Sequence, residues 1–178
     1  MPNMHWSKLS PMQLGRYAEY YAKMEFSSYG FDVYTSEVDD HGVDFVAKSP
    51  RNHVYYEIQV KSIRDTGYVF MKKTDMPLTE NRLVCVLIFS ENRLPEVFII
   101  PSTAWKTTDG ILVSHDYDNP GQKSRAEWGL NLSKKNIPPG SPIAPPSASE
   151  KNIMSEKILF SKSLLHNSIV SLMTTPPH

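Results

Sequence analysis

Three polar residues alternate with apolar ones in the segment Glu57-Ile-Gln-Val-Lys-Ser62. The two-residue period of a β-strand places Glu57, Gln59 and Lys61 on one face of it. Polar side chains on a strand with an otherwise apolar pattern cost free energy unless they are paired or used. Asp44 stands at the start of an earlier strand-like segment and adds a carboxylate. Together these residues offer several oxygen ligands and one amine.

This combination of side chains suits the hydrolysis of a phosphodiester bond. Hard divalent cations such as Mg²⁺ or Mn²⁺ prefer oxygen ligands. A bound cation can activate a water molecule and stabilise the charge that develops on the phosphoryl oxygens. A lysine beside the cation can stabilise the same charge or help to orient the attacking water. The residue types therefore favour a metal-dependent phosphodiesterase.

A helix and several strands must position these residues. Ser10-Pro11 is typical of a helix N-terminus, the helical spacing of apolar residues continues to Tyr29, and Gly30 is suited to end the helix. Strands are predicted at residues 31–34, 43–47, 54–62, 83–89 and 97–100, and a short helix at 102–105. Residues 67–80 form a polar, basic segment, and residues 114–136 are rich in turn formers, which indicates irregular structure there. The sequence predicts an α/β domain.

The order of these motifs resembles the PD-(D/E)xK nuclease superfamily, especially archaeal Holliday junction resolvases and Mrr-like restriction endonucleases. The motifs are Gly15-Arg16 with Glu19 on the helix, Gly42-Val-Asp44, and Ile58-Gln-Val-Lys-Ser62. The resemblance implies a restriction-endonuclease-like core, in which helices flank a central mixed β-sheet. It also implies that Glu19 is the helix acid, Asp44 the central metal ligand and Lys61 the catalytic lysine.

Gln59 departs from the family pattern, which places a glutamate two residues before the catalytic lysine. Some branches, including Mrr-like ones, have Q-x-K instead. Because an amide oxygen is a weaker metal ligand than a carboxylate, we expect Glu57 on the same face to compensate. The expected catalytic set is Asp44, Gln59, Lys61 and Glu19, and the expected ligands of Mg²⁺ or Mn²⁺ are Asp44, Glu57, Gln59 and Glu19.

The implied partner is a nucleic acid, specifically DNA, and the resemblance extends to enzymes that work as homodimers. Lys72, Lys73 and Arg82 are expected to contact phosphates, although a solvated basic loop would show the same pattern. Lys plus Arg and Asp plus Glu both total 19, so the formal net charge is zero. The basic excess that is usual for nucleic-acid binders is missing, which leaves a local basic face as the means of binding.

A second interpretation is a nuclease fold that has lost catalysis and binds nucleic acid or protein. Gln59 in place of an acid and the zero net charge both favour it. Glu19 would then be a solvated helix residue. Glu57, Gln59 and Lys61 would be the exposed face of an edge strand.

The composition changes at residue 137. We expect an α/β domain at 1–136, a linker rich in proline and serine at 137–152, and a tail at 153–178. The tail would form one amphipathic helix, which could bind a partner groove, or no stable structure.

Three further features of the sequence bear on the cellular location of the protein. Cys85 is the only cysteine, which excludes a disulfide within the chain. The N-terminus lacks the apolar core of a signal peptide, and no stretch has the length and apolar character of a membrane span. We therefore expect a cytoplasmic protein without membrane contact.

Overall fold

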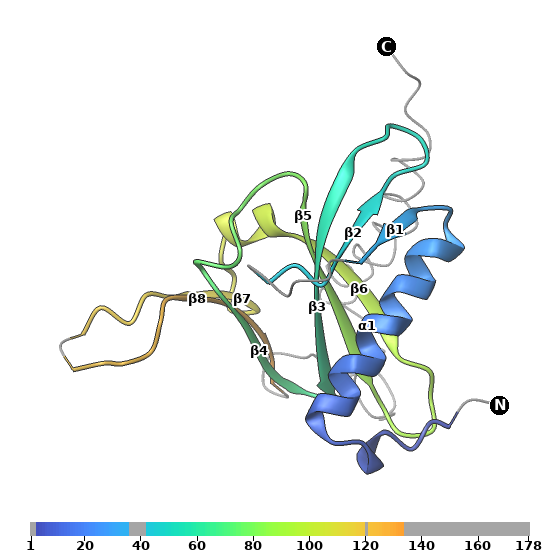
Figure 1. Ribbon diagram of the computed structural model, residues 1–178. Helices are drawn as coiled ribbons and strands as arrows, with labels where there is room; N and C mark the ends of the chain where they lie inside the picture. The colour runs from blue at the N-terminus through green and yellow to red at the C-terminus, as the bar shows by residue number, and fades with distance from the viewer. Residues whose placement is uncertain (1–2, 36–41, 120, 134–178) are drawn as a thin grey trace, which may run out of the picture.

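The computed structural model describes residues 3–35, 42–119 and 121–133 (Figure 1). Its central sheet has five strands in the order β1-β2-β3-β5-β6. Their bounds are Asp32–Tyr34 (β1), Phe45–Lys48 (β2), Tyr55–Arg64 (β3), Arg82–Phe89 (β5) and Glu96–Pro101 (β6). Strands β3 and β5 are parallel, whereas the other neighbours are antiparallel. The predicted α/β class with a central mixed sheet is confirmed.

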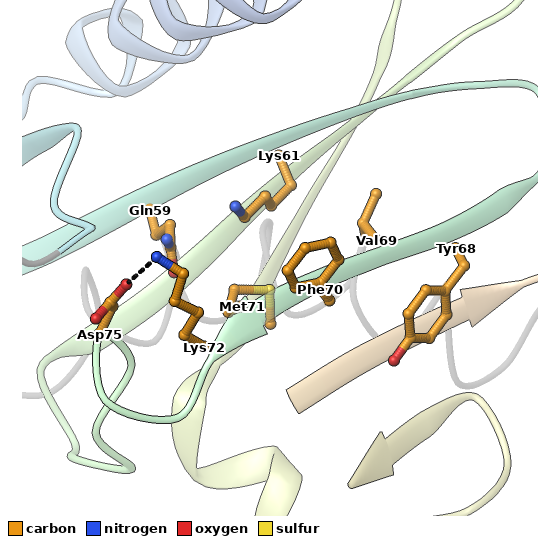
Figure 2. Close-up of a pocket in the computed structure, with 8 residues that line it drawn as sticks. All are labelled: Gln59, Lys61, Tyr68, Val69, Phe70, Met71, Lys72 and Asp75. Atoms are coloured by element: carbon orange, nitrogen blue, oxygen red, sulfur yellow. Dashed lines mark ion pairs between the residues drawn. The ribbon is translucent and has the colours of Figure 1, made fainter. Parts of the chain in front are cut away.

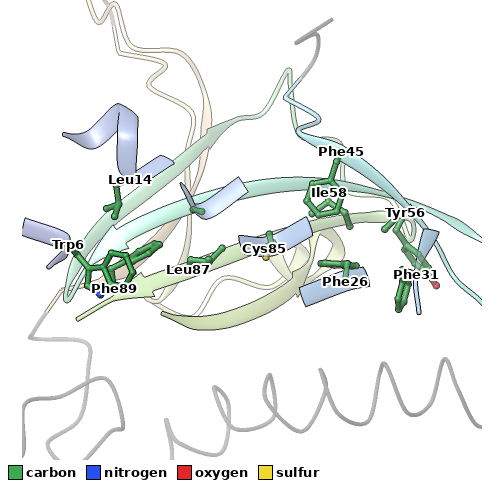
Figure 3. Close-up of a cluster of buried hydrophobic side chains, with 13 residues drawn as sticks. Trp6, Leu14, Phe26, Phe31, Phe45, Tyr56, Ile58, Cys85, Leu87 and Phe89 are labelled. Carbon is green, nitrogen blue, oxygen red and sulfur yellow. The ribbon is translucent and has the colours of Figure 1, made fainter. Parts of the chain in front are cut away.

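Helix α1 (Pro11–Ser28) covers one face of this sheet, after the short 3-10 helix η1 (Trp6–Lys8). The side chain of Ser10 accepts a hydrogen bond from the amide of Gln13, whose side chain accepts one from the amide of Ser10. This capping box satisfies two amides that the first helical turn leaves unpaired. The helix buries Leu14, Ala18, Ala22 and Phe26 in the core against the sheet. Figure 3 shows Leu14 and Phe26 within this core.

A second sheet covers the opposite face of the central sheet. It consists of β4 (Gly67–Lys72), β8 (Glu127–Leu132) and β7 (Leu112–His115), in the order β4-β8-β7. Its buried side chains, among them Met71, Leu130 and Leu132, pack with Val84 and Val86 of β5. The 3-10 helix η2 (Ser102–Lys106) contributes Trp105 to this second core.

The second sheet differs from two sequence-based expectations. Helices were expected to flank the sheet; in the described ranges α1 lies on one face, and strands cover the other. The apolar residues of β5 require an apolar cover, and alternating strand residues such as Val69 and Met71 provide it. Residues 67–80 were interpreted as a polar, basic segment with no strand assigned, and residues 114–136 as irregular, yet they contain β4 and β8.

The register of β3 decides which face its polar residues occupy. Gln59 pairs with Val84, and Lys61 pairs with Val86. Because paired residues of adjacent strands point to the same side of a sheet, Gln59 and Lys61 face the second sheet, away from α1. After β3 the chain turns at Asp65, which has a positive φ of 48°, and enters β4. The polar face of β3 therefore lies next to β4.

The helices of the described residues include none with the length and apolar character of a membrane span. The predicted linker and tail, residues 137–178, lie outside the described residues.

Candidate active site

A cleft of about 350 Å³ lies between β3 and β4. Strand β4 is at the edge of the second sheet, so the cleft opens beside a strand with one unpaired side. Figure 2 shows the amines of Lys61 and Lys72 pointing towards the end of the cleft where Gln59 and Asp75 lie. The lining residues are Gln59, Lys61, Tyr68, Val69, Phe70, Met71, Lys72 and Asp75.

Asp44 is fixed directly beside this cleft by the β2–β3 hairpin. Its amide donates to the carbonyl of Ile58 at 2.9 Å, and its Oδ2 accepts from the amide of Val60 at 2.6 Å. Since Phe45 pairs with Ile58 in antiparallel register, Asp44 lies opposite Gln59 on the same side of the sheet. The structure thus brings together Asp44, Gln59 and Lys61.

Gln59 is almost fully buried, with 7% of its surface exposed. Its Oε1 has no hydrogen-bond partner among the described residues. Gly42 explains how the preceding loop packs so closely: its φ is +66°, and a Cβ there would lie 2.7 Å from Nε2 of Gln59. A side chain at position 42 would therefore push Gln59 out of its place.

The amine of Lys61 lies in a half-buried, mixed electrostatic environment. Burial lowers the pKa of Lys61 from its usual value, and the nearby charge of Lys72 acts in the same direction. The carboxylates of Asp44 and Asp75 oppose that shift. A lysine with a lowered pKa beside carboxylates is typical of functional sites.

Asp75 is a cleft residue that sequence reasoning missed. It follows β4, pairs with Lys72 at 3.6 Å and accepts a hydrogen bond from Oγ1 of Thr74 at 2.7 Å. The hydrogen bond from Thr74 lowers the pKa of Asp75, and the charge of Lys72 adds to this effect. No local pattern marks it, since its position depends on how β4 turns the chain back towards β3.

Glu57 and Arg82 form an ion pair at the end of β3, with 2.8 Å between Oε2 and Nη1. Only 2% of Arg82 is exposed, and its Nη2 also donates to the carbonyls of Gly42 and Asp75 at 2.9 and 2.7 Å. Arg82 thus joins β3 to the two loops that carry Asp44 and Asp75. This arrangement supports neither the expected phosphate contact of Arg82 nor the expected metal ligation by Glu57.

Two other predicted residues lie away from the cleft. Glu19 pairs with Arg16 at 2.9 Å on α1, which covers the opposite face of the central sheet. The amine of Lys73 donates to Oγ of Ser114 at 2.7 Å, pairs with Asp116 at 2.5 Å and lies over the ring of Trp128. Of the three basic residues expected to contact phosphates, only Lys72 lines the cleft.

The donors around the cleft suit a hard metal ion by their type. The described residues contain no group of three or more His, Cys, Asp or Glu side chains that could hold one. The oxygen donors beside Lys61 are the carboxylates of Asp44 and Asp75 and the buried Oε1 of Gln59. A buried amide oxygen without a partner is costly, and a hard cation would satisfy it. The residue types fit Mg²⁺ or Mn²⁺.

Comparisons with known proteins give structural similarities only. No protein-family model and no curated protein matches the chain. Hjc, a Holliday junction resolvase from Archaeoglobus fulgidus, is 14% identical with a TM-score of 0.41, and the match covers 66% of this chain and 83% of Hjc. A bacterial homing endonuclease is 12% identical with a TM-score of 0.46, covering 93% of this chain and 99% of that one. Both are nucleases, as the sequence resemblance led us to expect, but likenesses of this size carry no argument about the family or the activity of this chain.

Proposed function

We propose that this chain is a metal-dependent endonuclease that hydrolyses phosphodiester bonds of DNA in the cleft between β3 and β4. The observation that carries the proposal is the grouping of Asp44, the buried Gln59 and Lys61 on one face of the β2–β3 hairpin. Burying these groups side by side costs free energy. The surrounding fold tolerates that cost because Arg82 holds the two neighbouring loops in place.

The residues have distinct roles in this proposal. Asp44, Gln59 and Asp75 would hold Mg²⁺ or Mn²⁺, which when bound polarises the phosphoryl group and activates water. Lys61 places a positive charge where the phosphoryl oxygens gain negative charge. Lys72, at the mouth of the same cleft, would position the phosphate without reading the sequence.

Replacing Asp44 by asparagine tests this proposal directly. Asp44→Asn retains an acceptor for the amide of Val60, so the hairpin should stay folded, but it removes the carboxylate charge. We expect cleavage of plasmid DNA with Mg²⁺ or Mn²⁺ to fall more than about a hundredfold, since even outer-shell partners of metal ligands are worth roughly 10- to 100-fold. Asp32→Asn, on a carboxylate with 65% of its side chain exposed, is the matched control. Unchanged cleavage by Asp44→Asn would exclude this site.

The catalytically silent module is the second candidate function. It is favoured by the lack, within the described residues, of a cluster of three metal-ligating side chains. The melting temperature separates the two functions. A metal at about a hundred times its dissociation constant stabilises the folded state by about 2.7 kcal/mol. If the chain is a silent module, Mg²⁺ should not raise its melting temperature, and the wild type should not cleave DNA. It should also bind DNA with the same affinity in Mg²⁺ and in EDTA.

A further inference from the structure

The outward face of the second sheet carries aromatic side chains next to the cleft. Along β4, Tyr68, Phe70 and Lys72 alternate on the exposed side, and 41% of Tyr68 and 49% of Phe70 are exposed. Their partners on the other side, Val69 and Met71, pack into the second core. The two rings adjoin on one face of β4 and leave about half of their surface in water, so together they form a patch that a ligand can reach.

The ring of Tyr68 is held in place above the second sheet. It lies over Gly129 of β8: a Cβ at Gly129 would be 2.6 Å from Cε2 of Tyr68 and closer still to its Oη. The Oη donates a hydrogen bond to Oε1 of Glu127 at 2.7 Å. The absent side chain of Gly129 and the hydrogen bond to Glu127 together fix one ring face against the sheet and leave the other outward.

Two more rings lie beside Tyr68 and the carboxylate of Glu127. The hydroxyl of Tyr117 donates to Oε1 of Glu127 at 3.0 Å, and its ring stacks on His115 at 5.6 Å between centroids. His115 in turn contacts Tyr68 at 6.4 Å. Tyr117 has a positive φ of 56°, an uncommon conformation for a bulky residue that persists only where the surroundings enforce it. We call Tyr68, Phe70, His115 and Tyr117 the aromatic platform.

The aromatic platform continues into the candidate active site. Tyr68 and Phe70 line the cleft together with Lys61 and Lys72 (Figure 2). Alternate residues of a strand are about 6.8 Å apart, so Lys72, Phe70 and Tyr68 present one cation and two rings in a row. Cations track the phosphates of a nucleic-acid strand while aromatic rings stack on its bases. In a paired duplex the base faces are occupied by their neighbours, whereas unpaired bases can leave the stack.

We propose that the aromatic platform binds unpaired bases of a nucleic-acid strand whose backbone passes through the cleft. The inference deepens the proposed function, on which it rests, by naming the substrate class: nucleic acid with a single-stranded stretch beside the scissile bond. Pre-organisation of Tyr68 by Gly129 and Glu127 lowers the cost of ordering the platform on binding.

Binding can be measured without cleavage, in EDTA, by fluorescence anisotropy of two labelled DNA duplexes. One is blunt, and the other carries a single-stranded overhang with 2-aminopurine, whose fluorescence falls when it stacks on a ring. Wild type should prefer the overhang, with quenching. Phe70→Ala should bind the overhang about tenfold more weakly, the order expected for losing one stacked base. Its binding of the blunt duplex should not change. Tyr20→Ala, on α1 with 60% of Tyr20 exposed, is the matched control and should retain wild-type binding and quenching.

Gly129→Ala provides a second variant that removes no ring. The added Cβ displaces Tyr68, so quenching should fall, while Tyr68→Phe keeps a ring above Gly129 and should retain most of it. Equal wild-type affinity for both duplexes, or undiminished quenching in Phe70→Ala and Gly129→Ala, would overturn the inference. Neither result depends on cleavage. The nuclease proposal instead fails if Asp44→Asn cuts like the wild type, whatever the overhang preference.

Discussion

A buried cation, Arg82, and a half-buried one, Lys61, lie on neighbouring strands of the central sheet, and their surroundings differ. Arg82 of β5 donates hydrogen bonds to Glu57 and to the carbonyls of Gly42 and Asp75. Lys61 of β3 has the charges of Asp44 and Asp75 in its neighbourhood. The described part of the chain nevertheless gives its amine neither a hydrogen bond nor an ion pair.

The difference separates a charge that supports the structure, that of Arg82, from a charge that is available to a ligand, that of Lys61. A buried charge with well-placed partners fixes the segments that it joins, and removing it leaves those partners unpaired. A half-buried charge with few partners lowers stability, and such groups are candidates for a functional role. Arg82 therefore maintains the shape of the site, and Lys61 is the residue that the site exposes to a ligand.

The largest effect should come from removing Arg82. Arg82→Ala leaves Glu57 and two buried carbonyls without their donor, so we expect it to lower the free energy of unfolding by about 3–5 kcal/mol in urea denaturation. Arg16→Ala is the matched control. Its ion pair with Glu19 is equally short, at 2.9 Å, but 68% of the Arg16 side chain is exposed, so about 1 kcal/mol or less should be lost. Equal losses of unfolding free energy in the two variants would mean that Arg82 supports the fold no more than an exposed arginine does.

An intermediate effect is expected at Gly42, whose carbonyl Arg82 binds. Gly42→Ala forces a side chain into a left-handed conformation, which costs roughly 1–2 kcal/mol, and displaces Gln59. Stability and cleavage should therefore fall together. Gly15→Ala is the control with the opposite sign: no atom lies within 4 Å of a Cβ there, and alanine is favoured over glycine in a helix by about 0.5–1 kcal/mol. A fully active, fully stable Gly42→Ala would contradict the packing described for this loop.

The smallest stability effect, but a large loss of activity, is expected for Lys61→Met. At neutral pH the free energy of unfolding of this variant should lie within about 1 kcal/mol of the wild-type value or above it, because the substitution removes a half-buried charge with few partners. Burial lowers the pKa of folded Lys61 below 10.5, so above that lowered pKa the unfolded chain binds more protons and wild-type stability rises with pH. Any advantage of Lys61→Met should thus shrink as pH approaches 10.5.

Lys123→Met, on an exposed lysine, should show no such pH dependence relative to the wild type in the same urea titrations. A loss of several kcal/mol in Lys61→Met, comparable to that in Arg82→Ala, would mean that Lys61 is architectural too.

The sequence revealed the parts of the molecule whose signals are local. The cap at Ser10 and the apolar run in β5 define their elements, and a short hairpin turn sets the register that places Asp44 beside Gln59. Strand β4 was missed because Tyr68 and Phe70 are apolar but face outward, which removes the usual alternation. In β8, Gly129 breaks the strand pattern to make room for the ring of Tyr68.

The rest of the site depends on non-local pairing. Glu57 meets Arg82 only through the parallel register of β3 and β5, and nothing in either segment alone indicates that pair. Asp75 reaches the cleft because the chain leaves the central sheet after β3, forms β4 in the second sheet and then turns back towards β3. Glu19 was assigned by the order of motifs, which does not indicate the face of the sheet that its helix covers.

All eight side chains that line the cleft come from residues 59–75, which comprise the second half of β3, all of β4 and the turns that follow them. The residues that hold this segment in place, Asp44 and Arg82, lie outside it. The exposed lining residues of β4 point away from the second core. A change at these few neighbouring positions can therefore alter what the cleft accepts while the packing of the core stays the same.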